Sequence, residues 1–439
     1  MKKSTRIVST ILAFAMMISF CACSNSSNGN TSPSGNGKVK ITFMSRDAGD
    51  TPMAKVYQSQ IDAFVKANPN ITVQNDSIYE ESAYNNKLKV DISTGAIPSV
   101  FYTPGIASLS QYAKNGVIMD LTKALDDDPK WKASFQDGAL DTYKLDAYGV
   151  KGIYGIPNEL NVDAMFYNKE LFKKAGITKI PETMDEFYDV IKKLNVAKIT
   201  PIGVGGKDTW VMGHIFNNIL AKRIGSDGIF ALGTGKKKWT DTDVVESLQI
   251  TKDLKDKYHA FADGFEGMDY NTQMNQFLTG EVAMITHSSP IIPEIMNSDS
   301  TIKDQFAIFP FPYFTDKPEY KDVHVIYTSG WFLSGNMTGE QKDATLKLVK
   351  FMTTPQSIQE RMNAAMRVAP YKNITPPSNA PQLFKDMISY SNTIKKSIGE
   401  YFDYDPTSTL CDSSRNAILN MMLSSSASDT ASLINSGKY

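Results

Sequence analysis

Three strand-like segments separated by two helical ones constrain the fold of this chain more than any other feature. Residues 39–44 (VKITFM), 71–79 and 99–103 are rich in the β-branched and aromatic side chains that strands favour. Between them, apolar residues recur at helical spacing after Pro52, and residues 80–94 form a second helical segment. This β-α-β-α-β order predicts a parallel, doubly wound sheet in an α/β fold.

A second α/β alternation begins near residue 151. Residues 152–157, 163–168 and 199–205 are strand-like, and a long helix is expected from residue 210 to 224. Residues 306–333 return to strand character and could complete the first sheet, so that the chain crosses between two lobes and leaves a hinge and a cleft. Helix starts are indicated by Thr183 with Glu186, Asp243 with Glu246, Thr338 with Gln341, and Thr354 before Pro355.

These patterns divide the folded part of the chain into two lobes. We expect lobe 1 to comprise residues 38–150 plus about 307–350. We expect lobe 2 to comprise residues 151–306 plus about 351–439.

The N-terminal segment has the pattern of an export signal. Basic residues precede an apolar run over residues 7–22, which is shorter than the ~20 residues of a spanning helix. Residues 20–24 (FCACS) resemble a bacterial lipobox, with Phe20 where that pattern prefers Leu. This predicts cleavage before Cys23 and a diacylglycerol lipid on its sulfur, with palmitate as a typical acyl group. An ordinary secretory signal cleaved nearby is the alternative.

The segment after the predicted cleavage site contains only Ser, Asn, Gly, Thr and Pro up to residue 37. Such a composition cannot form a core and predicts a flexible tether. We therefore expect a signal peptide at residues 1–22 and a lipidated cysteine with a linker at residues 23–37. The predicted location is the outer face of the cell membrane.

Charge and cysteine content exclude several classes of function. Net charge is −1, which gives no basic excess for holding nucleic acid. Cys411 is the single cysteine after the export segment and is expected to be a small buried residue. The four histidines lack metal-ligand spacing, and no nucleophile or phosphate-loop motif is complete, so we expect no metal, no cofactor and no catalysis. Paired carboxylates of a glycosidase, which need only proximity in space, stay open.

Several stretches follow one another along the chain in the order of a known pattern. They are residues 84–89 with 93–98 ("SGxxPDV"), 109–121 ("YAxxGxxxDL"), 154–157 with 166–172, 175–176 and 181–187 ("YGIP…YNKxLFxxAG…PxTxxEF"), 277–284 ("FxxGxxAM"), 310–312 and 352–356. Together they resemble the family-1 extracellular solute-binding proteins of ABC importers, the group that includes maltose-binding protein. Ser99 departs from this pattern, because it stands where the family usually has Asp.

The resemblance implies a two-lobed, monomeric binding protein that closes on its ligand like a hinge. It implies a carbohydrate ligand, in particular an oligosaccharide, and delivery to the permease subunits of an ABC transporter. The lipid on Cys23 would hold the protein at the membrane where the permease is. Two alternatives stay open: a secreted lipoprotein that processes carbohydrates, and a sugar-sensing partner of a membrane histidine kinase.

The first candidate site residues are those at strand ends. In doubly wound sheets, ligands bind outside the carboxyl ends of the parallel strands, and we call this the strand-end rule. Arg46 and Asp47 follow the first strand, and Tyr102 and Thr103 end the third. Tyr102 could stack on a sugar face. A local ion pair of small value is the alternative for Arg46 and Asp47.

Two tryptophans are candidates for stacking on a sugar. Trp210 follows a strand and a Gly-Gly-Lys-Asp segment, where the family often places a cleft aromatic. Trp331 follows Gly330 on a late strand, where the backbone could approach a ligand. Packing in a core is the alternative for both. Trp131 and Trp239 lie in charged surroundings, which predicts surface packing.

The remaining candidates are polar groups near the expected crossings. Glu159 and Asn161 lie where the chain enters the second lobe, and the resemblance implies a ligand-contacting carboxylate or amide there. His287 stands in a segment where many sugar binders carry Trp, and it could donate a hydrogen bond or be structural. Asp403 and Tyr404 form an aromatic and acidic cluster before the last helices.

Overall fold

The structure is a computed structural model that describes residues 38–104, 106–407 and 409–438. The segment Lys38–Tyr439 forms one compact unit. The predictions for the signal peptide, the lipidated Cys23 and the linker fall outside the described residues.

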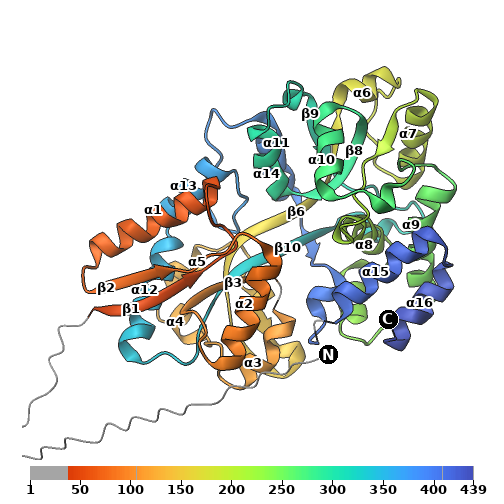
Figure 1. Cartoon of the computed structure of the whole chain (residues 1–439). Coiled ribbons are helices and arrows are strands. Elements are labelled where there is room, and N and C mark those ends of the chain that lie inside the picture. The colour runs from red at the N-terminus through yellow and green to blue at the C-terminus, as the bar shows by residue number, and fades with distance from the viewer. Residues whose placement is uncertain (1–37, 105, 408, 439) are drawn as a thin grey trace, which may run out of the picture. The chain divides into compact units, whose positions relative to one another are not determined.

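Nine strands of the described part form one mixed sheet (Figure 1). Their order is β2-β1-β3-β10-β6-β8-β7, with β11 beside β10 and β9 beside β6, and a separate hairpin joins β4 to β5. The strands are β1 (Val39–Met44), β2 (Ile71–Asn75), β3 (Val100–Pro104), β4 (Lys144–Leu145), β5 (Val150–Ile153), β6 (Ile156–Asn168), β7 (Thr200–Ile202), β8 (Val282–Ser288), β9 (Phe306–Phe309), β10 (Val323–Leu333) and β11 (Lys396–Ile398).

The predicted parallel β-α-β-α-β unit is confirmed. Strand β1 pairs in parallel with β2 and with β3. Helix α1 (Pro52–Ala67) begins where the sequence predicts, because the Thr51 hydroxyl accepts the Ala54 N–H at 3.2 Å and Pro52 needs no partner for its nitrogen. The carboxyl ends of β1 and β3 therefore lie side by side.

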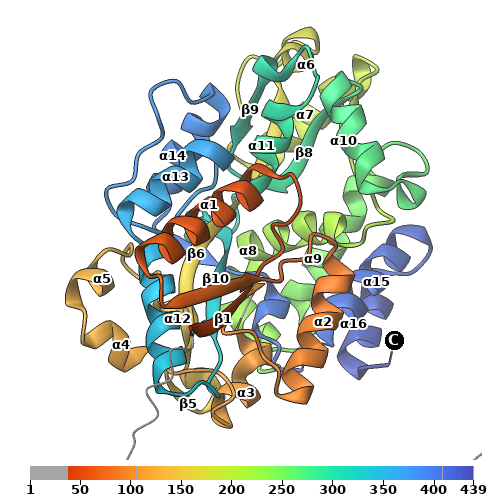
Figure 2. The same cartoon turned by 60° about the vertical axis from the view of Figure 1, so that its left-hand side comes forward.

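Strands β6 and β10 run through both halves of the molecule (Figures 1 and 2). The first half of β6 pairs with β10 from Ile156 to Val162, and its second half pairs with β8 and β9. Strand β10 also pairs with β3, so the late strand does complete the first sheet. The register of β10 on β6 shifts between Ser329 and Gly330.

Each half of the sheet has its own core, and we call the two halves the first and second lobes. The first core contains β1, β3 and the end of β10. Two further clusters surround the second half of β6. Helices that contribute to the first core are α1, α2 (Glu81–Thr94), α3 (Ser110–Lys114), α4 (Thr122–Asp126), α5 (Pro129–Ala133), α12 (Gly339–Met352) and α13 (Pro355–Ala365). Helices of the other clusters are α6 (Lys169–Lys174), α7 (Met184–Val196), α8 (Trp210–Gly233), α9 (Thr242–Asp256), α10 (Tyr270–Thr279), α11 (Ile292–Asn297), α14 (Gln382–Thr393), α15 (Leu410–Leu423) and α16 (Ala427–Ser436).

Chain segments after residue 350 contact both lobes. Helix α13 places Ile358 and Ala365 in the first core and Met362 in the third cluster. The residue boundaries of the two lobes stay a prediction.

One local prediction is wrong and three others are confirmed. The runs at 152–157 and 163–168 do have strand structure, and β6 joins most of them into one continuous strand from Ile156 to Asn168. Helix α9 begins at Thr242 after Asp241, so Asp243 is not its cap. Thr183 and Glu186 do form the predicted capping box, and Thr354 accepts the Ser357 N–H.

The cap predicted at Thr338 is only half right. Thr338 precedes helix α12, but its side chain makes no capping hydrogen bond. Gln341 instead donates from Nε2 to the Lys40 carbonyl oxygen at 3.3 Å, which ties α12 to β1.

Candidate ligand-binding site

A group of charged side chains lies at the carboxyl end of β1, and we call it the ionic cluster. Its members are Arg46, Asp47, Glu159 and Arg367. The Arg367 guanidinium lies 3.6 Å from Asp47 Oδ1 and 3.6 Å from Glu159 Oε2. Both ion pairs exceed hydrogen-bond length, so Arg367 interacts with these two carboxylates by charge rather than by close hydrogen bonds.

The ionic cluster is only partly shielded from water, because the side chains of Asp47 and Arg367 keep 20% and 21% of their surface exposed. Burial raises the pKa of Asp47 to about 6, while Arg367 opposes the rise and Glu159 adds to it. Glu159 is buried and its Oε1 accepts a hydrogen bond from the Ser329 hydroxyl at 3.2 Å. The cluster thus joins β1, β6, β10 and the segment after α13, and it combines three of the predicted site residues.

Trp331 occupies the first core and has 1% of its surface exposed. Its ring lies 4.9 Å from Phe43, 5.4 Å from Tyr57 and 6.4 Å from Tyr102, measured between ring centroids. Packing, one of the two hypotheses for Trp331, describes this environment. Neither face of the indole is free for a sugar in this conformation.

Tyr102 and Thr103 are half-buried in β3, opposite Trp331 and Gly330 of β10. Tyr84 of α2 donates from its hydroxyl to the Tyr102 carbonyl oxygen at 2.6 Å, which fixes the end of the strand. The strand-end rule therefore places these two residues beside the ionic cluster.

A second group of rings lies in the second lobe, and we call it the aromatic cluster. Trp210, the first residue of α8, lies 5.0 Å from Tyr270, 5.6 Å from His214 and 5.5 Å from His287. Tyr327 of β10 lies 6.3 Å from His214. Trp210, Tyr270 and Tyr327 are half-buried, so their rings keep accessible surface.

Buried polar groups lie against the aromatic cluster. Asp163 of β6, 1% exposed, accepts through Oδ2 from Asn218 Nδ2 at 2.9 Å and lies 3.1 Å from His214 Nδ1. Burial would lower the pKa of His214, but the Asp163 carboxylate outweighs it and the net shift is upward. His214 therefore carries positive charge more readily than a free histidine. The Ser288 and Tyr327 hydroxyls share a hydrogen bond of 3.0 Å beside this group.

His287 is 8% exposed and behaves differently from His214 although the rings are stacked 5.6 Å apart. Burial lowers the pKa of His287 to about 3, and the nearby His214 adds to the effect. The imidazole of His287 is thus neutral at physiological pH.

Asn161 is also buried. Its Nδ2 donates a long hydrogen bond of 3.4 Å to the Tyr327 carbonyl oxygen.

Tyrosines of the first lobe influence two phenols of the aromatic cluster electrostatically. Burial and Glu294 raise the pKa of Tyr270, and Tyr79 of the first lobe adds to the rise. Tyr79 follows β2 and is 68% exposed. Burial, Asp163 and Glu400 raise the pKa of Tyr327, and Tyr102 adds to this rise.

Asp403 and Tyr404 belong to a short 3-10 helix, Tyr401–Tyr404, rather than to either cluster. Asp403 Oδ2 accepts the Glu400 N–H at 3.0 Å, and the Tyr404 ring packs 5.2 Å from Phe230. Tyr148 donates from its hydroxyl to the Tyr404 carbonyl oxygen at 2.9 Å. These contacts fasten the C-terminal segment to the first lobe, and a ligand role for Asp403 and Tyr404 stays a prediction.

The family whose pattern matches the sequence is described as "Bacterial extracellular solute-binding protein", and the match covers residues 48–359, more than half of the chain. This chain belongs to that family. The resemblance noted from its motifs and the predicted α/β, two-lobed fold are thereby confirmed.

This solute-binding protein has relatives of similar length. It is 23% identical over 368 residues to the "Multiple sugar-binding protein" of Streptococcus mutans, covering 82% of this chain and 81% of that one. It is 24% identical over 294 residues to a "Probable sugar-binding periplasmic protein" of Mesorhizobium japonicum, covering 66% of each.

Solved structures share the fold. A structure titled "Chitin oligosaccharide binding protein" matches with a TM-score of 0.79 and 25% identity, over 91% of this chain and 98% of that one. A structure titled "Maltose bound T. maritima MalE3" matches with a TM-score of 0.69 and 18% identity, over 91% and 98%. The second likeness concerns the fold alone.

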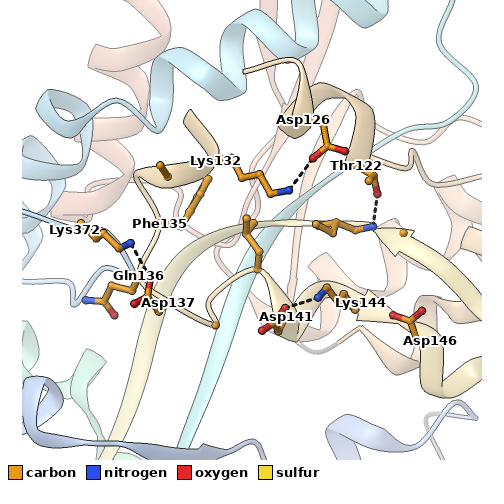
Figure 3. Close-up of a pocket in the computed structure, with 15 residues that line it drawn as sticks. Thr122, Asp126, Lys132, Phe135, Gln136, Asp137, Asp141, Lys144, Asp146 and Lys372 are labelled. Atoms are coloured by element: carbon orange, nitrogen blue, oxygen red, sulfur yellow. Dashed lines mark hydrogen bonds and ion pairs between the residues drawn. The ribbon is translucent and has the colours of Figure 1, made fainter. Parts of the chain in front are cut away.

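A surface hollow of about 610 Å³ lies elsewhere on this solute-binding protein, between α4, α5 and the β4–β5 hairpin (Figure 3). Its lysines already have partners: Lys132 with Asp126 at 2.7 Å, Lys144 with Asp141 at 2.6 Å and Lys372 with Asp137 at 2.8 Å. Because these charges are already compensated, the hollow is a weaker candidate than the two clusters.

Within the described ranges, neither a group of metal ligands nor a membrane-spanning helix is present. No group of three or more His, Cys, Asp or Glu side chains there is arranged to hold a metal ion. No helix in this part of the chain is both long and apolar enough to cross a bilayer.

Sequence reasoning missed five residues of the clusters: Asp163, His214, Tyr270, Tyr327 and Arg367. Asp163 gave one usable signal, because an acidic residue inside a run of strand formers is unusual and demands a partner. The partner, His214, is 51 residues away, and its contact exists only after α8 packs on β6. No local pattern predicts that pairing.

Proposed function

We propose that this protein binds a carbohydrate as the solute-binding component of an ABC importer. The observation that carries the proposal is the aromatic cluster. It places the half-buried rings of Trp210, Tyr270 and Tyr327 against the buried polar side chains of Asp163 and His287.

That combination suits a sugar. The C–H faces of a pyranose pack on aromatic rings, while its hydroxyls require hydrogen-bond donors and acceptors in the same site. Relatives and neighbours bear names that agree: the Streptococcus mutans relative is a sugar-binding protein, and a structural neighbour is named for chitin oligosaccharide. An oligosaccharide is our proposed ligand, because the aromatic cluster offers three accessible rings, Trp210, Tyr270 and Tyr327, on which more than one sugar unit can pack.

The proposed mechanism is closure of the lobes around the ligand. Binding shifts the population toward the closed form because the ligand then contacts both walls. The closed form would engage the permease subunits, and the protein itself would perform no chemistry. We further propose that it acts as a monomer held on the outer face of the cell membrane by a lipid on Cys23.

A thermal-shift screen of residues 38–439, which form a compact unit, tests the ligand class. The sugar panel is N,N′-diacetylchitobiose, cellobiose, xylotriose, raffinose, maltose and galactose, with amino acids, polyamines and phosphate as controls. A ligand at 100 times its dissociation constant stabilises the native state by about 2.7 kcal/mol, which raises the melting temperature by a few degrees. A shift with a control ligand and none with any sugar would refute the carbohydrate proposal.

Two further measurements test the remaining claims. Chromatography of the sugar after the screen should recover it intact, and released product would indicate an enzyme instead. Growth of the producing cells with labelled palmitate should label the wild-type protein but not Cys23→Ser. Label retained by Cys23→Ser would place the lipid elsewhere.

A further inference from the structure

Two buried polar atoms of the aromatic cluster have no hydrogen-bond partner among the described residues. They are Asp163 Oδ1 and His287 Nε2. Both side chains are more than nine-tenths buried. A buried polar atom without a partner costs free energy, and such atoms concentrate where a ligand or an ordered water completes the site.

Asp163 is held in place through its other oxygen. Oδ2 accepts from Asn218 Nδ2 at 2.9 Å and faces His214 Nδ1 at 3.1 Å. These two contacts come from successive turns of α8, so the carboxylate is oriented before any ligand arrives. Asp163 Oδ1 is left as an oriented hydrogen-bond acceptor.

His287 supplies the complementary donor. The Ser288 N–H lies 2.8 Å from His287 Nδ1, and the Ser288 carbonyl oxygen lies 3.1 Å from the same atom. A backbone N–H can only donate, so the shorter contact requires a lone pair on Nδ1. The proton of the neutral ring is then on Nε2, which becomes an unused N–H donor.

The two groups belong to one assembly. His214 joins them, because it contacts Asp163 and its ring stacks on that of His287 at 5.6 Å. The Trp210 ring stands edge-on to both histidines, at 86° and 88°. The Trp210 ring thus contacts His287 directly and is connected to Asp163 through His214.

We propose that Asp163 and His287 are specificity-determining residues of the sugar site, and that they bind an uncharged ligand group able both to donate and to accept a hydrogen bond. This inference rests on the proposed function. A sugar hydroxyl or an acetamido group has this chemistry: its O–H or N–H donates to Asp163 Oδ1, and its oxygen accepts from His287 Nε2. A carboxylate in the same place would be repelled by Asp163.

The test measures dissociation constants by isothermal titration, using residues 38–439 and the sugar panel named above. His287→Phe keeps a flat ring but removes the donor. Asp163→Asn keeps one oxygen for Asn218 and replaces the free acceptor by a donor. Each variant is expected to weaken the binding of sugar by about tenfold or more.

Matched controls separate this effect from a general loss of structure. His324 has an Nδ1 that lies 2.8 Å from the Tyr390 hydroxyl, outside the aromatic cluster, and Asp316 pairs with Arg223 at the surface. His324→Phe and Asp316→Asn should leave the dissociation constants within twofold of wild type. Melting temperatures of all four variants show that each one folds.

Comparison of two sugars identifies the group that is bound. If His287→Phe weakens the binding of N,N′-diacetylchitobiose but not of cellobiose, Asp163 and His287 bind an acetamido group. If the variant weakens the binding of both sugars equally, the two residues bind a hydroxyl. If the wild type binds sugars and both variants bind them within twofold of it, the pair is satisfied by water and the inference is wrong while the proposed function stands. If the wild type binds no sugar of the panel, the inference and the proposed function are both wrong.

Discussion

The aromatic side chains of the two lobes are used in different ways. In the first lobe, Trp331 is enclosed by Phe43, Tyr57 and Tyr102, and the nearby charges of Asp47 and Glu159 are balanced by Arg367. Trp331 is thereby enclosed in the core, although Trp331 Nε1 and Arg367 Nε have no hydrogen-bond partner among the described residues.

In the second lobe, Trp210 keeps accessible surface, and Asp163 and His287 each retain a buried atom without a partner. Unpartnered polar atoms therefore occur in both lobes, and the difference lies in the rings: Trp331 is enclosed, whereas Trp210 keeps accessible surface. Ring identity alone is thus a poor guide to a sugar site, and accessible ring surface is the informative feature.

The largest expected effect separates the two tryptophans by stability. Trp331→Ala removes a fully buried indole from the first core and should lower the free energy of unfolding by about 3–5 kcal/mol. Urea denaturation followed by fluorescence measures it, with Trp331→Phe as a milder control. A variant that keeps wild-type stability but loses sugar binding would show that Trp331 serves the ligand directly.

Trp210→Ala should have the opposite signature. Its half-buried ring contributes less to the core, so unfolding should change little, while affinity for the sugar falls about 10- to 100-fold, or about 1.4–2.8 kcal/mol. Titration calorimetry gives the affinity. Trp239→Phe is the control, because Trp239 is buried in the core of the same lobe. Equal affinity losses in both variants would contradict the assignment of the site.

The pH dependence of stability should reveal a carboxyl group in the C-terminal segment whose ionisation is unfavourable in the folded state. Burial and the neighbouring Glu400 raise the pKa of Asp403 from 3.8 to about 7. The folded chain therefore binds a proton that the unfolded chain releases, and stability should fall as pH rises between these two values. Asp403→Asn keeps an acceptor for the Glu400 N–H and should weaken that fall. Denaturation curves at pH 4.5 and 7.5 that stay as far apart as in wild type would exclude Asp403 as the source.

The smallest effect concerns the hydrogen bond between the lobes. Tyr148→Phe removes the hydroxyl that donates to the Tyr404 carbonyl oxygen and should lower the free energy of unfolding by about 0.5–1.5 kcal/mol. Tyr188→Phe serves as a comparison, since Tyr188 stacks on Tyr258 within the second lobe. If Tyr148→Phe also changes sugar affinity, this contact influences closure as well as stability.

Much of the fold could be predicted because its signals are local. The parallel unit of β1, β2 and β3 follows from alternating segments, and the Thr183–Glu186 capping box follows from spacing. Asp47 follows the carboxyl end of β1, as the strand pattern predicts, and its ligand role stays a prediction. The continuity of β6 through both lobes was not predicted, because polar residues such as Glu159 suggested a loop.

The candidate site could be predicted only in part, because burial depends on distant residues. Trp131 and Trp239 were expected at the surface, and both are buried, with 7% and 5% exposed. Trp131 donates from Nε1 to Thr353 Oγ1 at 2.9 Å, and the Lys350 ammonium lies 5.1 Å from its ring centroid. A lysine that is distant in the sequence therefore helps to cover this ring, and the charged residues next to Trp131 in the sequence do not predict its exposure.

The passage of β6 and β10 through both lobes has a consequence for how the protein melts. Val325 of β10 belongs to the second core and Phe332 of the same strand belongs to the first. If one core unfolds, β6 and β10 lose part of their backbone hydrogen bonds, and the other core depends on the same two strands. Calorimetry should accordingly record a single cooperative transition for residues 38–439, with equal van't Hoff and calorimetric enthalpies, rather than one peak for each lobe.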